Sequence, residues 1–192
     1  NEVFSKATFD GPVGIAWDKT HTNLFISEWF GHTIRKINTG TGSNYGVSTF
    51  AGSGAAGSAD GIGTEASFDN PVGITIDENN NLYVADSNNN LIRKITFNGE
   101  SSFSGGLSGI VSTYAGSGIA GTVNGSASVA TFYKPYGVEM SQDNRTFYVT
   151  DFWGNTIRKV IANFAPVINT IEDVTINEDE SVNKSLKIEK KK

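Results

Sequence analysis

Short runs of hydrophobic residues that alternate with polar ones recur along the chain and predict β-strands. Residues 81–86 (NLYVAD) are typical, because aromatic and β-branched side chains follow an asparagine and precede a turn-forming segment. Residues 23–28 (NLFISE) and 146–151 (TFYVTD) have the same pattern. Helix-forming residues are few, whereas glycine supplies 22 of the 192 residues. We therefore predict an all-β fold with many turns.

These runs are organised in three repeated units. Each unit opens with an aromatic residue, a proline and a short apolar strand, and further strands follow in the same order. The strands are expected within 9–18, 23–28, 33–37 and 47–54, within 68–77, 81–86, 91–95 and 111–118, and within 132–141, 146–151 and 156–160. The fourth strand has no third copy. Four short strands that bury their faces against neighbouring units describe a propeller blade.

The repeated motifs P-x-G-[IV], N-L-[FY]-[IV] and [IL]-R-K-[IV] resemble NHL repeats. This resemblance implies a β-propeller segment over residues 1–163, with blades at about 9–54, 68–118 and 132–163. The AGSG-x-AG loops resemble a subgroup found in large secreted bacterial proteins and in some eukaryotic surface proteins. Residues 164–192 resemble a linker followed by the first strand of a cadherin-like or immunoglobulin-like β-sandwich module.

NHL propellers typically close with about six blades, so three blades imply an incomplete ring. Two copies could complete the ring, or the chain could be a segment of a longer protein, and we favour the segment. It begins with Asn1 and shows no signal peptide, which also suggests a processed or partial chain. The expected partners are therefore other protein chains or further blades of the same parent chain.

One segment raises a different function. Residues 52–57 (GSGAAG) spell the G-x-G-x-x-G fingerprint of dinucleotide-binding loops, and residues 116–121 (GSGIAG) repeat it. A phosphate-binding loop needs a helix directly after it, but the following residues are rich in glycine and other helix breakers. We therefore interpret both loops as connections between blades in which glycine allows turn geometry.

The turn between the second and third strands carries the same acidic and basic positions in each unit. A carboxylate in this hairpin can accept turn N–H bonds or pair with an arginine across the hairpin. The carboxylates are Glu28, Asp86 and Asp151, and the arginines are Arg35, Arg93 and Arg158. Recurrence in every unit favours a structural role over a shared metal site.

The tips of these hairpins are the candidate binding surface, because inter-blade loops and hairpins share one face of a propeller. Large aromatic side chains are costly to leave in water, so they either pack beneath the glycine loops or form a platform for a protein or glycan. Neighbouring amides could add hydrogen bonds. The candidates are Trp29, Phe30, His32, Asn88, Asn89, Asn90, Phe152, Trp153 and Asn155.

The remaining chemistry is limited. The chain has no cysteine, a net charge of −5 and no apolar run long enough to span a membrane. Each arginine of the third strand is followed by a lysine, but neighbouring strand residues point to opposite faces, which argues against a nucleic-acid-binding surface. In the tail, Glu178, Asp179 and Glu180 are candidate calcium ligands, although a solvated acidic turn is the favoured interpretation.

The sequence therefore predicts a non-enzymatic module of a larger secreted or cell-surface protein, with a structural, adhesive or protein- or glycan-binding role and no cofactor except calcium in the tail. The first alternative is a calcium-dependent lactonase-like hydrolase, for which Asp18 and Asp77 follow the inner strand but Ser141 takes the third position. The second alternative is an RNA-binding NHL domain. No nucleic-acid partner and no membrane insertion are expected.

Overall fold

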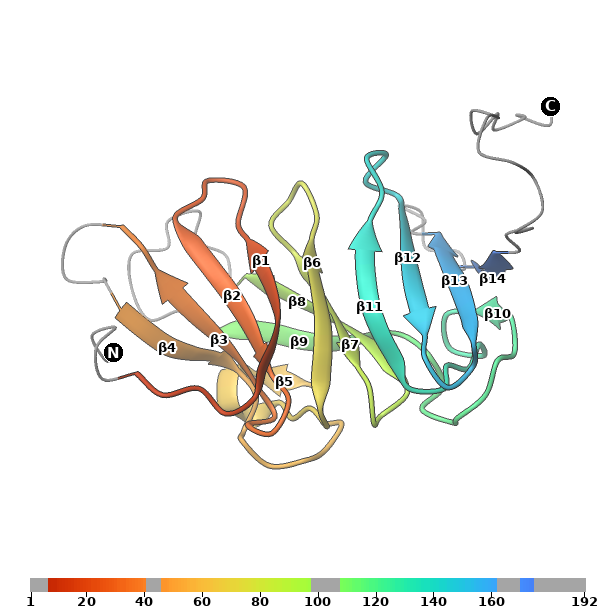
Figure 1. Cartoon of the computed structure of the whole chain (residues 1–192), viewed down its shortest axis with the longest axis horizontal. Coiled ribbons are helices and arrows are strands. Elements are labelled where there is room, and N and C mark those ends of the chain that lie inside the picture. Colours follow the sequence, from red (N-terminus) through yellow and green to blue (C-terminus); the bar gives the residue numbers. More distant parts are fainter. Residues whose placement is uncertain (1–6, 41–45, 98–107, 162–169, 175–192) are drawn as a thin grey trace.

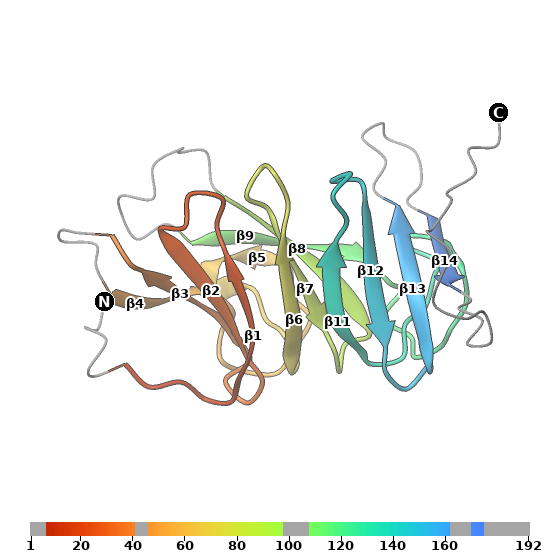
Figure 2. The same cartoon turned by 45° about the horizontal axis from the view of Figure 1, so that its top comes forward.

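The computed structural model describes residues 7–40, 46–97, 108–161 and 170–174. These residues form three antiparallel sheets that follow one another along the chain and lie side by side in an arc (Figures 1 and 2). The all-β prediction is confirmed, and the sheets are the blades of an incomplete propeller. Within the described residues, no helix has the length and apolar character to cross a membrane.

The first two blades match the expected units. Blade 1 contains β1 (Pro12–Trp17), β2 (Asn23–Glu28), β3 (Thr33–Asn38) and β4 (Gly46–Ala51), paired in that order. Blade 2 contains β6 (Pro71–Ile76), β7 (Leu82–Asp86), β8 (Leu91–Phe97) and β9 (Gly109–Ala115), with the two-residue β5 (Gly61–Ile62) added outside β9. A short 3₁₀ turn, η1 (Gly63–Glu65), follows β5.

Blade 3 differs from the prediction at its outer edge. It contains β11 (Pro135–Met140), β12 (Thr146–Asp151), β13 (Thr156–Ile161), β14 (Thr170–Val174) and β10 (Gly125–Ser126). The expectation that this blade has no fourth strand is wrong, because β14 pairs with β13 and β10. The propeller segment thus continues past residue 163. Residues 175–192, with most of the expected second module and Glu178, Asp179 and Glu180, lie outside the described residues.

The fourth strand of blade 3 was missed because it does not carry the VST[FY]AGSG motif. One of its positions nevertheless matches the other two copies. Ile171 pairs with Val160 and is fully buried, as Val47 and Val111 are in the other blades. A strand at this position needs one buried β-branched residue facing the neighbouring blade, and Ile171 satisfies that requirement.

Two hydrophobic cores hold the blades together. The core between blades 1 and 2 includes Phe25, Phe50, Leu82 and Ile95, and the core between blades 2 and 3 includes their counterparts. In the second core these are Tyr83, Tyr114, Phe147 and Val160. Each blade therefore buries its side chains against the next blade, as expected for a repeat protein.

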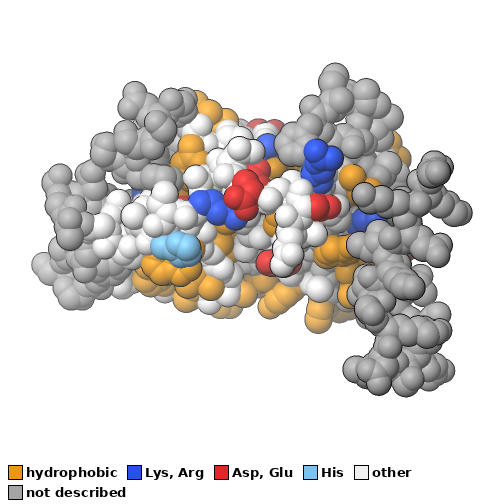
Figure 3. All heavy atoms as spheres, turned by 90° about the horizontal axis from the view of Figure 1, so that it is seen from above, with side chains coloured by type: hydrophobic (Ala, Val, Ile, Leu, Met, Phe, Trp, Pro, Cys, Tyr) orange, Lys and Arg blue, Asp and Glu red, His pale blue; other side chains and the backbone are white. Residues whose placement is uncertain are grey.

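The two ends of the strands form two different faces. The hairpins β2–β3, β7–β8 and β12–β13 lie at one end, together with the inter-blade loops (Figure 1). Figure 3 shows the opposite face, where charged side chains lie among the loops and hydrophobic side chains gather along one long edge. On that face Lys19 forms an ion pair of 2.9 Å with Glu78 and links blades 1 and 2.

Candidate functional site

The hairpin carboxylates and arginines pair in all three blades. The N–O distances are 3.2 Å between Arg35 and Glu28, 2.9 Å between Arg93 and Asp86, and 3.2 Å between Arg158 and Asp151. Each carboxylate also accepts the N–H of the residue that follows the opening phenylalanine, namely Asp10, Asp69 or Tyr133. The pair thus joins the hairpin to the start of the inner strand.

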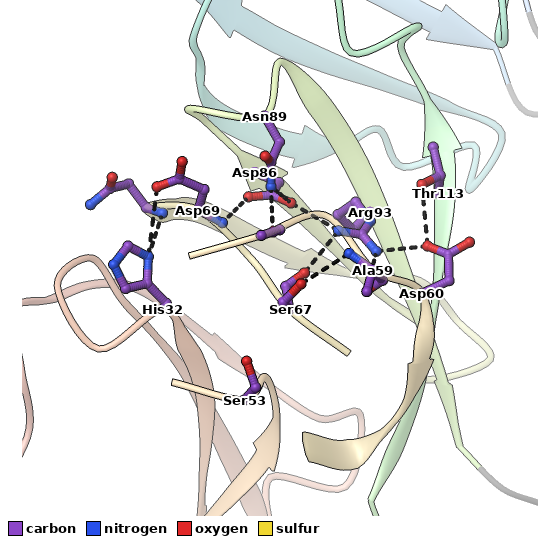
Figure 4. Close-up of polar contacts among 12 residues, drawn as sticks. His32, Ser53, Ala59, Asp60, Ser67, Asp69, Asp86, Asn89, Arg93 and Thr113 are labelled. Atoms are coloured by element: carbon purple, nitrogen blue, oxygen red, sulfur yellow. Dashed lines mark hydrogen bonds and ion pairs between the residues drawn. The ribbon is translucent and has the colours of Figure 1, made fainter. Parts of the chain in front are cut away.

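Blade 2 shows how far this network extends (Figure 4). The Arg93 guanidinium donates to Asp86, to Asp60 at 2.7 Å and to the carbonyls of Ser67 and Ala59. Its charged carbon lies 5.4 Å from the centre of the Phe68 ring, which adds a cation–π contact. Apart from Asp86, these partners belong to the loop that leads into blade 2. The arginine therefore fixes the inter-blade loop, which is a structural role.

Burial raises the pKa of the two carboxylates whose ion pairs are fully buried, Asp86 and Asp151. It raises the pKa of Asp86 to about 6, although hydrogen bonds from Asn89 and the Asp69 amide and the charge of Arg93 act in the opposite direction. Burial also raises the pKa of Asp151. These shifts follow from the desolvation of a structural ion pair, so they do not by themselves identify an acid or base for catalysis.

The glycine loops have no phosphate-binding geometry. The N–H of Gly52 donates to the Gly63 carbonyl and the N–H of Gly57 donates to the Phe68 carbonyl, so both donors are already used. The loop leads into β5 and a 3₁₀ turn of three residues instead of an α-helix. Gly52 has a φ of +102°, and a Cβ there would lie 2.6 Å from the His32 carbonyl oxygen. The interpretation of the loop as a connection between blades is confirmed.

Four of the predicted polar binding residues are bonded within the fold, and two of them link neighbouring blades. His32 accepts the Asn70 N–H through Nδ1 at 3.1 Å, and Asn90 accepts the Lys134 N–H at 3.0 Å. The amide of Asn89 donates to the Gly57 carbonyl and to Asp86. The amide of Asn88 donates to Asp69 and Asn70. These amide donors are thus occupied within the fold.

The aromatic side chains form one continuous strip on the hairpin face. Ring centres are 6.0 Å apart for Trp29 and Tyr136, 5.6 Å for Tyr136 and Phe152, 6.2 Å for Phe152 and Trp153, and 6.0 Å for Trp153 and Tyr133. We call these five residues the aromatic strip. It joins blade 1 to blade 3, because Trp29 comes from the β2–β3 hairpin whereas Tyr136 lies on β11.

The strip is accessible to a ligand. The exposed fractions are 61% for Phe152 and 57% for Trp153, and Phe30 in the turn of the β2–β3 hairpin is 66% exposed. The alternative that these three rings pack beneath the glycine loops is therefore wrong, and only Trp29 is partly covered. An exposed apolar surface of this kind on a folded protein marks a recognition surface more often than a random part of the exterior.

Two members of the strip, Tyr133 and Tyr136, were not predicted from the sequence. The signal was present in the opening motif of the third unit, FYKPYG, where the first two units have FDGPVG and FDNPVG. Two tyrosines replace an aspartate and a valine at positions that are otherwise repeated. Such a departure within a repeat can indicate a local function, because the scaffold alone does not require it.

The positions of the acidic side chains and of the lysines on the third strand of each blade test the metal-binding and nucleic-acid-binding alternatives. Within the described residues, no group of three or more His, Asp or Glu side chains is placed to hold a metal ion. The lysines that follow the blade arginines lie on the other face of the strand, where Lys36 is 5.7 Å from the Phe50 ring centre and Lys94 is 5.6 Å from that of Tyr83. Burial lowers the pKa of Lys36.

Sequence comparison finds similarity to several proteins, among them one that is named for its NHL repeats. The chain is 35% identical over 89 residues to NHL repeat-containing protein 2 of Gallus gallus, covering 45% of this chain and 12% of that protein. It is 41% identical over 75 residues to the chloroplastic protein SUPPRESSOR OF QUENCHING 1 of Arabidopsis thaliana, covering 39% of this chain and 7% of that protein. The chain thus spans a small part of each relative.

Two solved structures with a similar fold come from Bacteroides species. A structural genomics protein of unknown function from Bacteroides thetaiotaomicron has a TM-score of 0.65 at 23% identity, over 90% of this chain and 38% of that chain. An auxiliary nutrient binding protein from Bacteroides ovatus has a TM-score of 0.62 at 22% identity, over 84% of this chain and 37% of that chain. These likenesses show the fold.

The family model locates the repeat itself. Residues 68–95, which span β6 and β7 and most of β8, match the NHL repeat. The motifs that carry this match recur in blades 1 and 3 at the same places in the sheet. The chain therefore contains an NHL repeat and folds as three blades of an incomplete β-propeller.

Proposed function

We propose that this propeller segment is a non-enzymatic binding module that recognises an apolar segment of a partner protein through the aromatic strip. One observation carries the proposal, namely that five rings from blades 1 and 3 form a continuous surface on the hairpin face, and four of them are exposed. Aromatic side chains are the commonest anchors of protein interfaces, because they bury a large area and lose little conformational entropy.

The surrounding polar groups favour a protein over a glycan. Recognition of a sugar needs several side chains that are free to hydrogen-bond with its hydroxyl groups. The amide donors of Asn88, Asn89 and Asn90 are instead bonded within the fold. An apolar peptide segment needs fewer such groups, since it gains most of its affinity from buried area.

We further propose that the module belongs to a secreted or cell-surface protein with an adhesive or structural role. Its long glycine loops resemble those of secreted propeller proteins. The named function of one structural neighbour, an auxiliary nutrient binding protein, is compatible with this environment. Binding, and not turnover, is the expected activity.

Selection of ligands by the chain itself tests the proposal. A displayed random-peptide library and a glycan array are probed with the 192-residue chain, and selected ligands are then measured against variants. We expect aromatic and aliphatic peptides to be enriched. Trp153→Ala and Phe152→Ala should each weaken binding at least about tenfold, as for residues at the centre of an interface.

Trp17→Phe is the matched control, because Trp17 is exposed but lies at the other end of β1, away from the hairpin face. It should leave binding unchanged. Selection of glycans alone would overturn the choice of a protein partner. Ligands that bind Trp153→Ala and the parent chain equally well, or calcium-dependent turnover of a lactone panel, would overturn the proposed function.

A further inference from the structure

The two junctions between blades follow one rule. We call the flank of a blade that faces the next blade in sequence its trailing flank, and the opposite one its leading flank. Phe25 and Ile34 of blade 1 occupy the same positions on the trailing flank as Tyr83 and Ile92 of blade 2. All four are buried against the following blade. The chain thus repeats one interface twice.

The leading flank of blade 1 is open. Ile15 is 62% exposed, whereas its counterparts Ile74 and Val138 are 7% and 6% exposed in the two junctions. An apolar groove of about 340 Å³ lies on this flank. Its lining residues include Phe9, Val13, Ile15, Leu24, Ile26 and Ile37. In blades 2 and 3, the residues that correspond to these six are buried in the cores between blades, with the exception of those that correspond to Val13.

The trailing flank of blade 3 is open as well. Tyr148 is 41% exposed, whereas its counterparts Phe25 and Tyr83 are 0% and 4% exposed. Ile157 is only partly buried, although Ile34 and Ile92 at the same position are fully buried. The chain therefore presents one free copy of each half of its own interface.

Polar groups at the two open flanks also match. At the existing junctions, His32 accepts the Asn70 N–H and Asn90 accepts the Lys134 N–H. The third copy of the acceptor is Asn155, and the third copy of the donor is the N–H of Gly11. Among the described residues, neither the Asn155 side chain nor the Gly11 N–H has a hydrogen-bond partner. Both positions already have the left-handed φ of their counterparts, +51° and +65°.

A glycine in the inner strand supports the same conclusion. A Cβ on Gly73 would lie 2.5 Å from the Tyr136 carbonyl oxygen of the next blade, and a Cβ on Gly14 would clash with Val72 in the same way. At the third copy, Gly137, the nearest atom is Oγ1 of Thr150 in its own blade, at 3.0 Å. The trailing flank of blade 3 thus has room for a strand like β1.

We propose that the trailing flank of blade 3 docks on the leading flank of blade 1 in a second copy of this chain. Tyr148 then packs into the groove beside Leu24, and Asn155 accepts the Gly11 N–H across the new junction. The contact is head-to-tail, because each copy contributes a different surface. It does not depend on the aromatic strip or on the ligand of that strip.

Two blocking variants test the contact. Ile15→Asp places a charge on the leading flank, and Tyr148→Asp places one on the trailing flank. Because both residues are exposed, each variant should keep its fold, which circular dichroism and thermal unfolding verify. Light scattering after size-exclusion chromatography should give a dimer or larger assembly for the parent chain and a monomer for each variant.

Mixing the two variants is the decisive step. Each keeps the flank that the other lacks, so an equimolar mixture should form a one-to-one complex. Asn155→Ala should weaken self-association of the parent chain several-fold, whereas Ile119→Asp, at an exposed inter-blade loop residue, should leave it unchanged. Three results would overturn the proposal: a monomeric parent chain at all concentrations, assembly that neither variant reduces, or variants that do not complement each other. A monomeric chain would assign the open flanks to further blades of a parent protein.

Discussion

Asp86 and Arg93 form an ion pair of 2.9 Å in which neither side chain is exposed to solvent. The same pair recurs in blade 3 as Asp151 and Arg158, and in blade 1 as Glu28 and Arg35, where the arginine is 17% exposed. The difference follows from position. Blades 2 and 3 have a preceding blade that covers the arginine, whereas the leading flank of blade 1 is open.

Arg93→Met should destabilise the protein far more than Arg35→Met. The first substitution leaves the Asp86 carboxylate buried without its cation, which costs about 3–5 kcal/mol. The second also leaves a buried carboxylate, Glu28, but Arg35 is 17% exposed and water can take part of its place, so a smaller loss of about 1–2 kcal/mol is expected. Urea unfolding of the two variants measures the difference. Equal losses of unfolding free energy in the two variants would mean that burial of an ion pair does not determine how much the pair stabilises the fold.

Asp86→Asn should change how stability depends on pH. Burial raises the pKa of Asp86 from 3.8 to about 6 in the folded state, so the folded chain holds this proton more tightly than the unfolded chain. The contribution of Asp86 to the free energy of unfolding should then fall as pH rises from about 4 to about 6, by at most about 1.4 kcal/mol per pH unit.

Comparison of the parent chain with the Asp86→Asn variant isolates this effect, because all other titrating groups are common to both proteins. The difference in unfolding free energy between the parent and the variant should decrease across that pH interval and stay constant above it. Asp10→Asn, at an exposed position, serves as the control. A difference that grows with pH would show that Arg93 outweighs desolvation.

Gly52→Ala should destabilise the loop between blades 1 and 2. Its φ of +102° and the 2.6 Å separation between a Cβ and the His32 carbonyl oxygen together predict a loss of about 1–3 kcal/mol. Gly40→Ala is the control, because only the side chain of Asn38 lies near it. Thermal unfolding should show a lower midpoint temperature for Gly52→Ala than for the parent chain and no change for Gly40→Ala. Similar midpoint temperatures for the two variants would contradict the prediction.

Ile171→Ala tests whether β14 belongs to blade 3. Ile171 is fully buried in the core between blades 2 and 3, so its truncation should lower the free energy of unfolding by about 2–4 kcal/mol. Val129→Ala is the control, because Val129 is an exposed aliphatic residue in the loop between β10 and β11, and it should have little effect on the free energy of unfolding. A neutral Ile171 variant would place residues 170–174 outside the blade.

Local patterns determined most of the fold. Strand positions follow from alternating side chains, because one face of each strand must meet the neighbouring blade, and the hairpin ion pairs follow from residues that recur at one spacing. The carboxylate and arginine were therefore predictable as partners. The role of the glycine loops was also predictable, since no helix-forming segment follows them.

The fourth strand of blade 3 and the aromatic strip needed the tertiary structure. Ile171 and Asp173 complete blade 3 by long-range pairing with β13, and no short motif records that pairing. Trp29 and Tyr136 are far apart in sequence, but the curvature of the blade arc brings their rings to 6.0 Å. The sequence by itself determined the strands that carry the repeated motifs, because those motifs alternate hydrophobic and polar side chains. Only the packing of blade on blade decided which side chains remain exposed, because exposure depends on whether a neighbouring blade is present.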